Sequence, residues 1–240
     1  MIGIVYSEKD LAGKGIAAEL KAIGCRHELV KITQDIIYPK GIDALGMEFL
    51  VFASRHKSSS GTKSLTVHST GNFGKAEFGG RDKELQATLA NAKHNIYLEL
   101  VGCALDYGVT LEATHHGPTE FKTPLFFVEI GSSEEQWADK KAAEFVAECI
   151  ARGLDSKKKH PHAIGFGGGH YAPKFSGMEE VAFGHICPKY AAGLLDGGLI
   201  QQMVERTVDG VGHAVIDEKG LKGGQKLVIK RALDGLGIDY

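Results

Sequence analysis

The chain has 240 residues, 32 of them glycine and 11 histidine, and a formal net charge of −2 at pH 7. The usual glycine share of a protein is about 7%, so glycine is over-represented here. The glycines follow no period of three, which excludes a collagen-like fibre. No run of 18 apolar residues occurs, which excludes a membrane-spanning helix, and the near-neutral charge gives no ground for inferring a nucleic-acid partner.

The N-terminus starts with a short apolar segment and lacks the charged start and long apolar run of a signal peptide. The four cysteines contain no C-x-x-C pair and are too few for a disulfide framework in a chain of this length. We therefore expect an intracellular protein located in the cytoplasm.

The first two thirds of the chain alternate between strand and helix patterns. We expect strands at residues 2–6, 27–32, 48–54, 64–68, 108–116 and 125–130, and helices at 10–23, 82–105 and from 132 onward. Asp10 is the expected N-cap of the first helix, and Ser132 with Glu135 has capping-box spacing. Residues 55–61 are expected to form a polar loop.

The last third has a less regular pattern. We expect a strand that ends at Ile164, further strands at 183–187 and 211–216, and helices at 190–206 and 222–236. This alternation predicts a three-layer α/β/α fold with a mixed, mostly parallel sheet. No linker or repeat divides the chain, so we expect one compact domain over 1–240 that has room for a small C-terminal subdomain.

Glycine and histidine occur together in four segments, each of which follows a predicted strand. The segments are residues 64–74, 112–120, 165–175 and 184–190. In α/β sheets, ligands bind outside the carboxyl ends of the strands, and glycine lets a backbone come close to a ligand. We therefore expect the four segments to meet at one site.

Histidine and carboxylate are the ligands that Zn²⁺ prefers in hydrolytic sites, where the bound water has a pKa of about 7. The candidate ligands are His115, His116, Glu120, His170 and His185. Consecutive strand residues point to opposite faces, so His115 and His116 can share a metal only where the strand ends or bulges. Pro118 favours such an end. A structural role for each histidine remains the alternative.

Other residues of the four segments have candidate roles in catalysis or binding. His68 is a candidate ligand or general base, while Lys174 and Lys189 are candidates for stabilising an oxyanion or holding phosphates. A solvated surface charge is the alternative for either lysine. The candidate substrate-binding residues are Gly71, Asn72, Phe73, Gly168, Gly169 and Tyr171.

The four segments, in this order, resemble the archaeal and plant D-aminoacyl-tRNA deacylase family, the second type of that activity. The matching blocks read S-L-T-V-H-S-T-G-N-F-G, E-A-T-H-H-G-P-T-E, G-F-G-G-G-H-Y-A-P-K-F and G-H-I-C-P-K-Y. The resemblance implies a phosphorylase/hydrolase-like fold and hydrolysis of the ester between a D-amino acid and the terminal adenosine of tRNA. It also implies two zinc ions per chain and a monomer.

Binding of tRNA would require local positive charge. Lys222, Lys226 and Lys230 form a basic stripe at helical spacing, and Lys157 to Lys159 form a second patch; a solvated surface is the alternative for both. Three other functions remain open: a zinc amidohydrolase or peptidase with small substrates, a non-catalytic tRNA-binding module, and a nucleoside phosphorylase-like enzyme.

Overall fold

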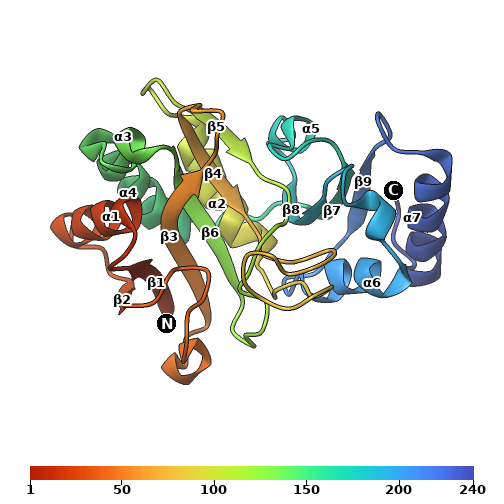
Figure 1. Cartoon of the computed structure of the whole chain (residues 1–240), viewed down its shortest axis with the longest axis horizontal. Helices are drawn as coiled ribbons and strands as arrows, with labels where there is room; N and C mark the ends of the chain where they lie inside the picture. Colours follow the sequence, from red (N-terminus) through yellow and green to blue (C-terminus); the bar gives the residue numbers. More distant parts are fainter.

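The computed structural model describes all residues, 1–240, and has two β-sheets with helices packed around them (Figure 1). The strands of the larger sheet are β1 (Ile2–Ser7), β2 (Glu28–Ile32), β3 (Phe49–Lys57), β4 (Ser64–His68), β5 (Gly108–Leu111) and β6 (Leu125–Ser132). They lie in the order β2-β1-β3-β6-β4-β5. Every neighbouring pair is parallel except β4 with β6. The α/β fold with a mixed, mostly parallel sheet is therefore confirmed.

The smaller sheet is formed by the last third of the chain. Its three parallel strands are β7 (His162–Gly167), β8 (Ala182–Cys187) and β9 (His213–Asp217), in the order β8-β7-β9. The helices are α1 (Leu11–Ala22), α2 (Ala90–Val101), α3 (Glu134–Trp137), α4 (Lys140–Asp155), α5 (Pro173–Ser176), α6 (Gly197–Glu205) and α7 (Gly223–Leu236). Short 3₁₀ helices lie at Ile42–Leu45 and Ala192–Leu194. None of the helices is both long and apolar enough to cross a bilayer.

Helix α2 lies between the two sheets. Its residues Ile96 and Leu100 share one core with strands of the large sheet and with Phe183 of β8. Helices α6 and α7 cover the other face of the small sheet, where Ile164 and Phe166 are buried. The small sheet therefore has helices on both faces, as the predicted three layers require.

The large sheet has helices on one face only. Helices α1, α2 and α4 cover that face. On the opposite face, Phe52 and Phe127 stack with ring centroids 4.9 Å apart and pack against Ile36 and Ile42 from the connection between β2 and β3. A loop and a 3₁₀ turn therefore replace the second helical layer there, and this leaves space for a cleft at the end of the sheet.

The bounds of four predicted elements are wrong. The helix expected at 82–105 comprises only α2, because residues before it run extended: the backbone N–H of Gln86 donates to Thr70, and that of Thr88 to Arg206. The N-terminus of α2 is capped by the carboxylate of Asp209, 119 residues later, which accepts hydrogen bonds from the N–H groups of Ala90 and Asn91. Tertiary contacts thus override the local helical pattern.

The polar segment at 55–61 is not a loop throughout. Strand β3 continues to Lys57, because residues 50–57 pair in register with β6. The predicted strand 108–116 ends at Leu111, and the helix expected at 190–206 starts only at Gly197. The cap of α1 is confirmed, since Asp10 accepts a hydrogen bond from Gly13 at 2.8 Å, but the capping box uses Ser133 and Gln136 instead of Ser132 and Glu135.

The close packing of α2 and α4 depends on Gly153. A Cβ atom at this position would lie 2.6 Å from the Cα of Ile96. We expect Gly153→Ala to lower the free energy of unfolding by about 1–3 kcal/mol, since overpacking forces backbone shifts. Gly235→Ala in α7, where a Cβ would meet no atom within 4 Å, serves as the control and should be neutral or stabilising. Urea denaturation checks both variants, and equal stability of the two would contradict this packing.

Candidate metal centre

One cleft of about 860 Å³ is lined by loops that follow four different strands. The segment after β4 contributes residues 71–75, 77 and 78, that after β5 residues 114–116, that after β7 residue 170, and that after β8 residues 188, 190, 191 and 194. The carboxyl end of β3, residues 54–57, forms a further wall. The glycine- and histidine-bearing segments therefore meet in space. The sequence pattern did not predict that the end of β3 also lines the cleft.

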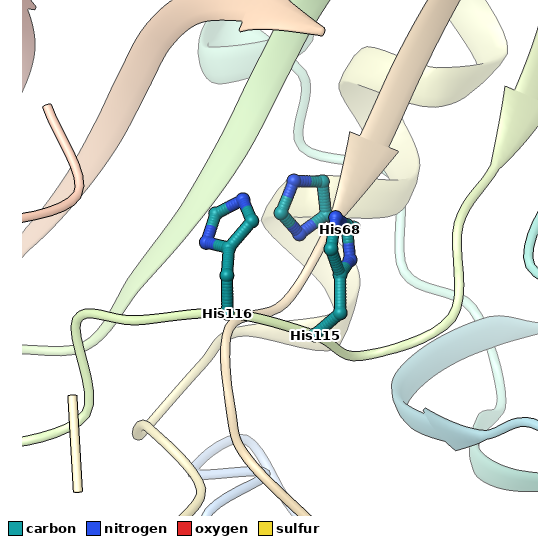
Figure 2. A group of neighbouring side chains, drawn as sticks. All are labelled: His68, His115 and His116. Atoms are coloured by element: carbon teal, nitrogen blue, oxygen red, sulfur yellow. The ribbon is translucent and has the colours of Figure 1, made fainter. Parts of the chain in front are cut away.

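Five histidines and two glutamates form a cluster at this cleft, and all of them except His68 and Glu112 line it. The residues are His56, His68, His115, His116, His170, Glu112 and Glu129. The ring centroid of His115 lies 4.2 Å from that of His68, 4.4 Å from that of His116 and 4.6 Å from that of His170. Figure 2 shows His115 and His116 rising from one loop toward His68, which ends β4.

The two consecutive histidines share one side because the strand has already ended. Strand β5 stops at Leu111, and His116 has a left-handed φ of 40°. This conformation is costly for a non-glycine residue and recurs at functional sites. The next residue, Gly117, packs so closely that a Cβ would lie 2.3 Å from the carbonyl carbon of Gly79. Only glycine fits there.

Four of the imidazoles are anchored through the same nitrogen. Nδ1 lies 3.1 Å from the Ser69 carbonyl in His68, 2.9 Å from the Ala113 carbonyl in His115 and 2.6 Å from the Gly117 carbonyl in His116; in His170 it lies 3.2 Å from the Tyr190 hydroxyl. A carbonyl oxygen only accepts, so Nδ1 of the first three rings carries the proton. Their Nε2 atoms are left with free lone pairs, the state of an imidazole that is ready to bind a metal.

Glu112 lies among these Nε2 atoms. Its side chain is fully buried, with Oε1 3.1 Å from Nδ1 of His56 and 3.6 Å from Nε2 of His170. Its Oε2 lies 3.9 Å from Nε2 of His68 and 4.0 Å from Nε2 of His115. The two carboxylate oxygens of Glu112 make no hydrogen bond, and the Nε2 of His68 makes none either. Since a buried carboxylate without hydrogen bonds is costly, the cluster requires a cation or a proton beside Glu112.

The second carboxylate, Glu129, has more partners. It accepts a hydrogen bond from Ser54 at 2.5 Å, and its Oε2 lies 3.5 Å from Nε2 of His68 and 3.6 Å from Nδ1 of His56. Burial opposes its ionisation, but the two histidines outweigh burial and hold the pKa of Glu129 well below its usual range. Burial, together with the charge of Glu129, raises the pKa of Glu112 well above its usual range.

Three histidines of the cluster, His115, His116 and His170, remain neutral at physiological pH. Burial, with smaller contributions from neighbouring imidazoles, lowers the pKa of His116 and that of His170 to about 4. The same causes lower the pKa of His115 well below its usual range. Neutral imidazole is the form that binds a metal.

Three groups of side chains could each hold a metal ion, with ligand atoms within 4.8 Å of one another. They are His68 with His115 and His116; Glu112 with His115 and His170; and His56 with Glu112 and Glu129. The first and third groups share no residue. The cluster therefore has enough ligands for two ions.

Of the residues proposed from the sequence as metal ligands, His115, His116 and His170 lie in the cluster, as does His68. Glu120 and His185 do not. Glu120 is exposed, and its carboxylate accepts from the N–H of Thr119, because the chain has turned away from the cleft. His185 is buried within β8, with Nδ1 3.2 Å from the Thr114 hydroxyl.

The two candidate lysines lie outside the cleft. Lys174 donates to the carbonyl of Ile216 in β9 at 2.9 Å. Lys189 is exposed and does not line the cleft. Neither lysine is therefore placed to stabilise an oxyanion near the cluster.

Only some of the candidate substrate-binding residues line the cleft. Gly71, Asn72 and Phe73 line the cleft. Gly168 and Gly169 do not line it, and Tyr171 contacts the cluster through its hydroxyl, 3.0 Å from Nε2 of His56.

Three cluster residues were missed in the sequence: His56, Glu112 and Glu129. Glu129 interrupts the apolar run of residues 125–130, and a carboxylate in a buried strand is a signal that could have identified it. Glu112 opens the second block, where no spacing pattern marks it as a ligand. The sequence pattern predicts a loop at His56, whereas pairing with β6 extends β3 and places His56 at the site.

The buried histidines make the stability of the folded protein depend on pH. Burial lowers the pKa of His185 to about 3, whereas an unfolded chain titrates histidine near 6.5. Below about pH 6.5 the unfolded state binds a proton that the folded state does not, so stability is lost as the pH falls, by up to about 1.4 kcal/mol per pH unit for this one group.

In metal-free protein, we expect His185→Asn to make the free energy of unfolding depend less steeply on pH between pH 6.5 and pH 5. The slope should fall by up to about 1.4 kcal/mol per pH unit, which corresponds to the binding of one proton fewer on unfolding. Urea denaturation over this pH range measures the slope. A variant with the slope of the unmodified chain would contradict the neutral state of His185.

Comparison with known proteins places this chain in a family. Residues 44–240 match the family model described as D-aminoacyl-tRNA deacylase. The D-aminoacyl-tRNA deacylase of Methanosarcina acetivorans is 39% identical over 238 residues, 93% of this chain and 79% of the relative. That of Ignicoccus hospitalis is 36% identical over 244 residues, 99% of this chain and 98% of the relative. The crystal structure of AF0625, a conserved protein of unknown function, covers 100% of this chain and 94% of its own at 32% identity, with a TM-score of 0.94. The chain therefore belongs to the D-aminoacyl-tRNA deacylase family of hydrolases.

Proposed function

We propose that this chain is a zinc-dependent deacylase that hydrolyses the ester bond between a D-amino acid and the terminal adenosine of tRNA. The products are the free D-amino acid and the tRNA. The observation that carries the proposal is the convergence of anchored Nε2 atoms on the buried carboxylate of Glu112, whose oxygens make no hydrogen bond. Family membership supports the substrate.

The donor set of the cluster suits zinc. Imidazole nitrogen with carboxylate oxygen is the usual combination in catalytic zinc sites, whereas Mg²⁺ and Ca²⁺ prefer oxygen ligands alone. The hydrogen bonds from Nδ1 to backbone carbonyls are the outer contacts that zinc-binding histidines usually make. We propose one ion at His68, His115 and His116 and a second at His56, Glu112 and Glu129, because these groups share no residue.

Bound zinc would supply a water of lowered pKa and polarise the ester carbonyl. The chain itself provides a base. The side chain of His170 is 34% exposed and lines the cleft, Nδ1 faces the Tyr190 hydroxyl, and Nε2 is available. Because its pKa is lowered to about 4 by burial and the nearby histidines, His170 is neutral at pH 7. It can take a proton from the attacking water at Nε2 and return it to the departing ribose oxygen.

The cleft volume of about 860 Å³ is that of a pocket for a ligand larger than a single amino acid. We therefore propose that the aminoacylated terminal nucleotide enters the cleft with its ester at the histidine cluster. Action on tRNA favours a cytoplasmic location, and the monomeric state is part of the same proposal.

Substitution of a cluster glutamate by glutamine tests whether the cluster binds zinc and supports hydrolysis. The same substitution of a glutamate outside the cluster is the control. We expect Glu112→Gln to lower both zinc content and the rate of D-tyrosyl-tRNA hydrolysis, the rate by about 100-fold or more, because it removes a buried ligand charge. Glu120→Gln, on the exposed side of the same segment, should retain both. Zinc is measured by atomic absorption and hydrolysis by release of labelled D-tyrosine.

Retention of zinc and activity in Glu112→Gln would remove the carboxylate from the site. Stoichiometric zinc in the unmodified chain with hydrolysis of small D-aminoacyl amides but not of D-tyrosyl-tRNA would favour the amidohydrolase alternative. No zinc and no hydrolysis would favour a non-catalytic tRNA-binding module.

A further inference from the structure

We propose that one region of the cleft binds the unpaired terminal nucleotides of tRNA, with Phe78 and Tyr190 as stacking surfaces for bases and Arg55, Lys57 and Lys75 as phosphate contacts. All five residues line the cleft that contains the histidine cluster. The inference rests on the proposed function and specifies how that substrate is held.

Phe78 is the one exposed phenylalanine among the 11 in the chain, with 63% of its surface accessible. Its backbone, in contrast, is firmly fixed. The Phe78 carbonyl accepts from the N–H of Gly117 at 2.9 Å, and the buried side chain of Asn72 donates to the carbonyls of Gly79 and Arg81 at 2.9 and 3.2 Å. A fixed turn that presents an aromatic ring to solvent is preorganised for binding.

The turn also ties Phe78 to the centre. Its partner Gly117 follows His116, and Gly79 and Gly80 adopt left-handed φ angles of 78° and 77°. A Cβ at Gly80 would lie 2.7 Å from the side chain of Thr119, in the same loop as the two histidines. The position of the Phe78 turn is therefore set by the loop that carries candidate metal ligands.

Tyr190 is anchored at one edge only. Its hydroxyl lies 3.2 Å from Nδ1 of His170, while 62% of the residue is exposed. A base stacked on this ring would lie beside His170, next to the cluster. This is where the terminal adenosine must lie for its ester to reach the candidate zinc ligands.

The cationic side chains of the cleft are available to a ligand. Arg55, Lys57 and Lys75 form none of the salt bridges in the chain. The Arg55 guanidinium makes two other contacts: it donates to the carbonyl of Lys9 at 3.5 Å and lies 5.3 Å from the ring centroid of Trp137. The basic stripe predicted on α7 differs, because Lys226 and Lys230 both pair with Glu218, at 3.3 and 3.2 Å.

Asp35 and Glu77 line the cleft as well, so the surface is not strongly positive. The cations can therefore direct the path of a few phosphates without attracting duplex nucleic acid. Exposed aromatic rings combined with cations are the usual means of binding single strands, and stacking is tolerant of base identity. Such a surface suits an unpaired RNA end.

The test is fluorescence anisotropy with a short labelled single-stranded RNA that ends in adenosine, together with kinetics on D-tyrosyl-tRNA. Phe78→Ala and Tyr190→Ala should each weaken RNA binding by about 5- to 100-fold, the range expected for loss of one stacked base. Tyr240→Ala, which removes a tyrosine that is 51% exposed and lies outside the cleft, is the matched control and should change nothing.

Two further variants separate stacking from other roles. Tyr190→Phe keeps the ring and should bind RNA normally, although its kcat can fall because the His170 contact is lost. Phe78→Ala should raise KM for D-tyrosyl-tRNA with little change in kcat. Lys57→Gln and Lys75→Gln should each reduce the slope of log binding constant against log salt by about 0.7, whereas Lys21→Gln on α1 should not.

Unchanged RNA affinity and KM in Phe78→Ala and Tyr190→Ala would overturn the inference, even if the unmodified chain is an active deacylase. RNA binding that depends on both rings in a chain that does not hydrolyse D-tyrosyl-tRNA would refute the proposed function and leave the inference standing. Both aromatic variants alter exposed side chains, so thermal melting should show the unmodified stability.

Discussion

The centre depends on hydrogen bonds between imidazole Nδ1 atoms and backbone carbonyls. Three such bonds, in His68, His115 and His116, fix both the ring orientation and the tautomer. The accepting carbonyls belong to neighbouring residues, so the path of the backbone decides where each Nε2 points. The glycine-rich turns are thus part of the candidate metal centre, because they allow the backbone to take that path.

A buried polar layer beneath the cluster holds this backbone in place. Ser69, which follows His68, donates to the carbonyl of Gly184 at 2.7 Å. The buried Nζ of Lys93 donates to the Ser69 hydroxyl at 2.5 Å and to the Gly184 carbonyl at 2.6 Å. Thr114, which precedes His115, exchanges hydrogen bonds with Ile186. The ends of β4 and β5 are therefore joined to β8 of the small sheet. The two sheets position the centre together, which explains why it lies at their junction.

The sequence was sufficient for those parts of the structure that depend on local patterns. Alternating strands and helices predicted the α/β class, and the paired surplus of glycine and histidine predicted four segments that the structure brings to one cleft. The sequence was insufficient where distant residues decide. The start of α2 is set by Asp209, and the length of β3, which brings His56 to the site, is set by β6. The sequence predicted Glu120 as a ligand and did not identify Glu112, because spacing along a chain does not show where a loop turns outward.

The central claim is that the cluster binds zinc, and diffraction at the zinc absorption edge tests it most directly. Crystals of active protein purified without chelators should show two anomalous peaks. One should lie among His68, His115 and His116, and the other among His56, Glu112 and Glu129. Anomalous maps without a peak in the cleft, from protein that hydrolyses D-tyrosyl-tRNA, would contradict the account.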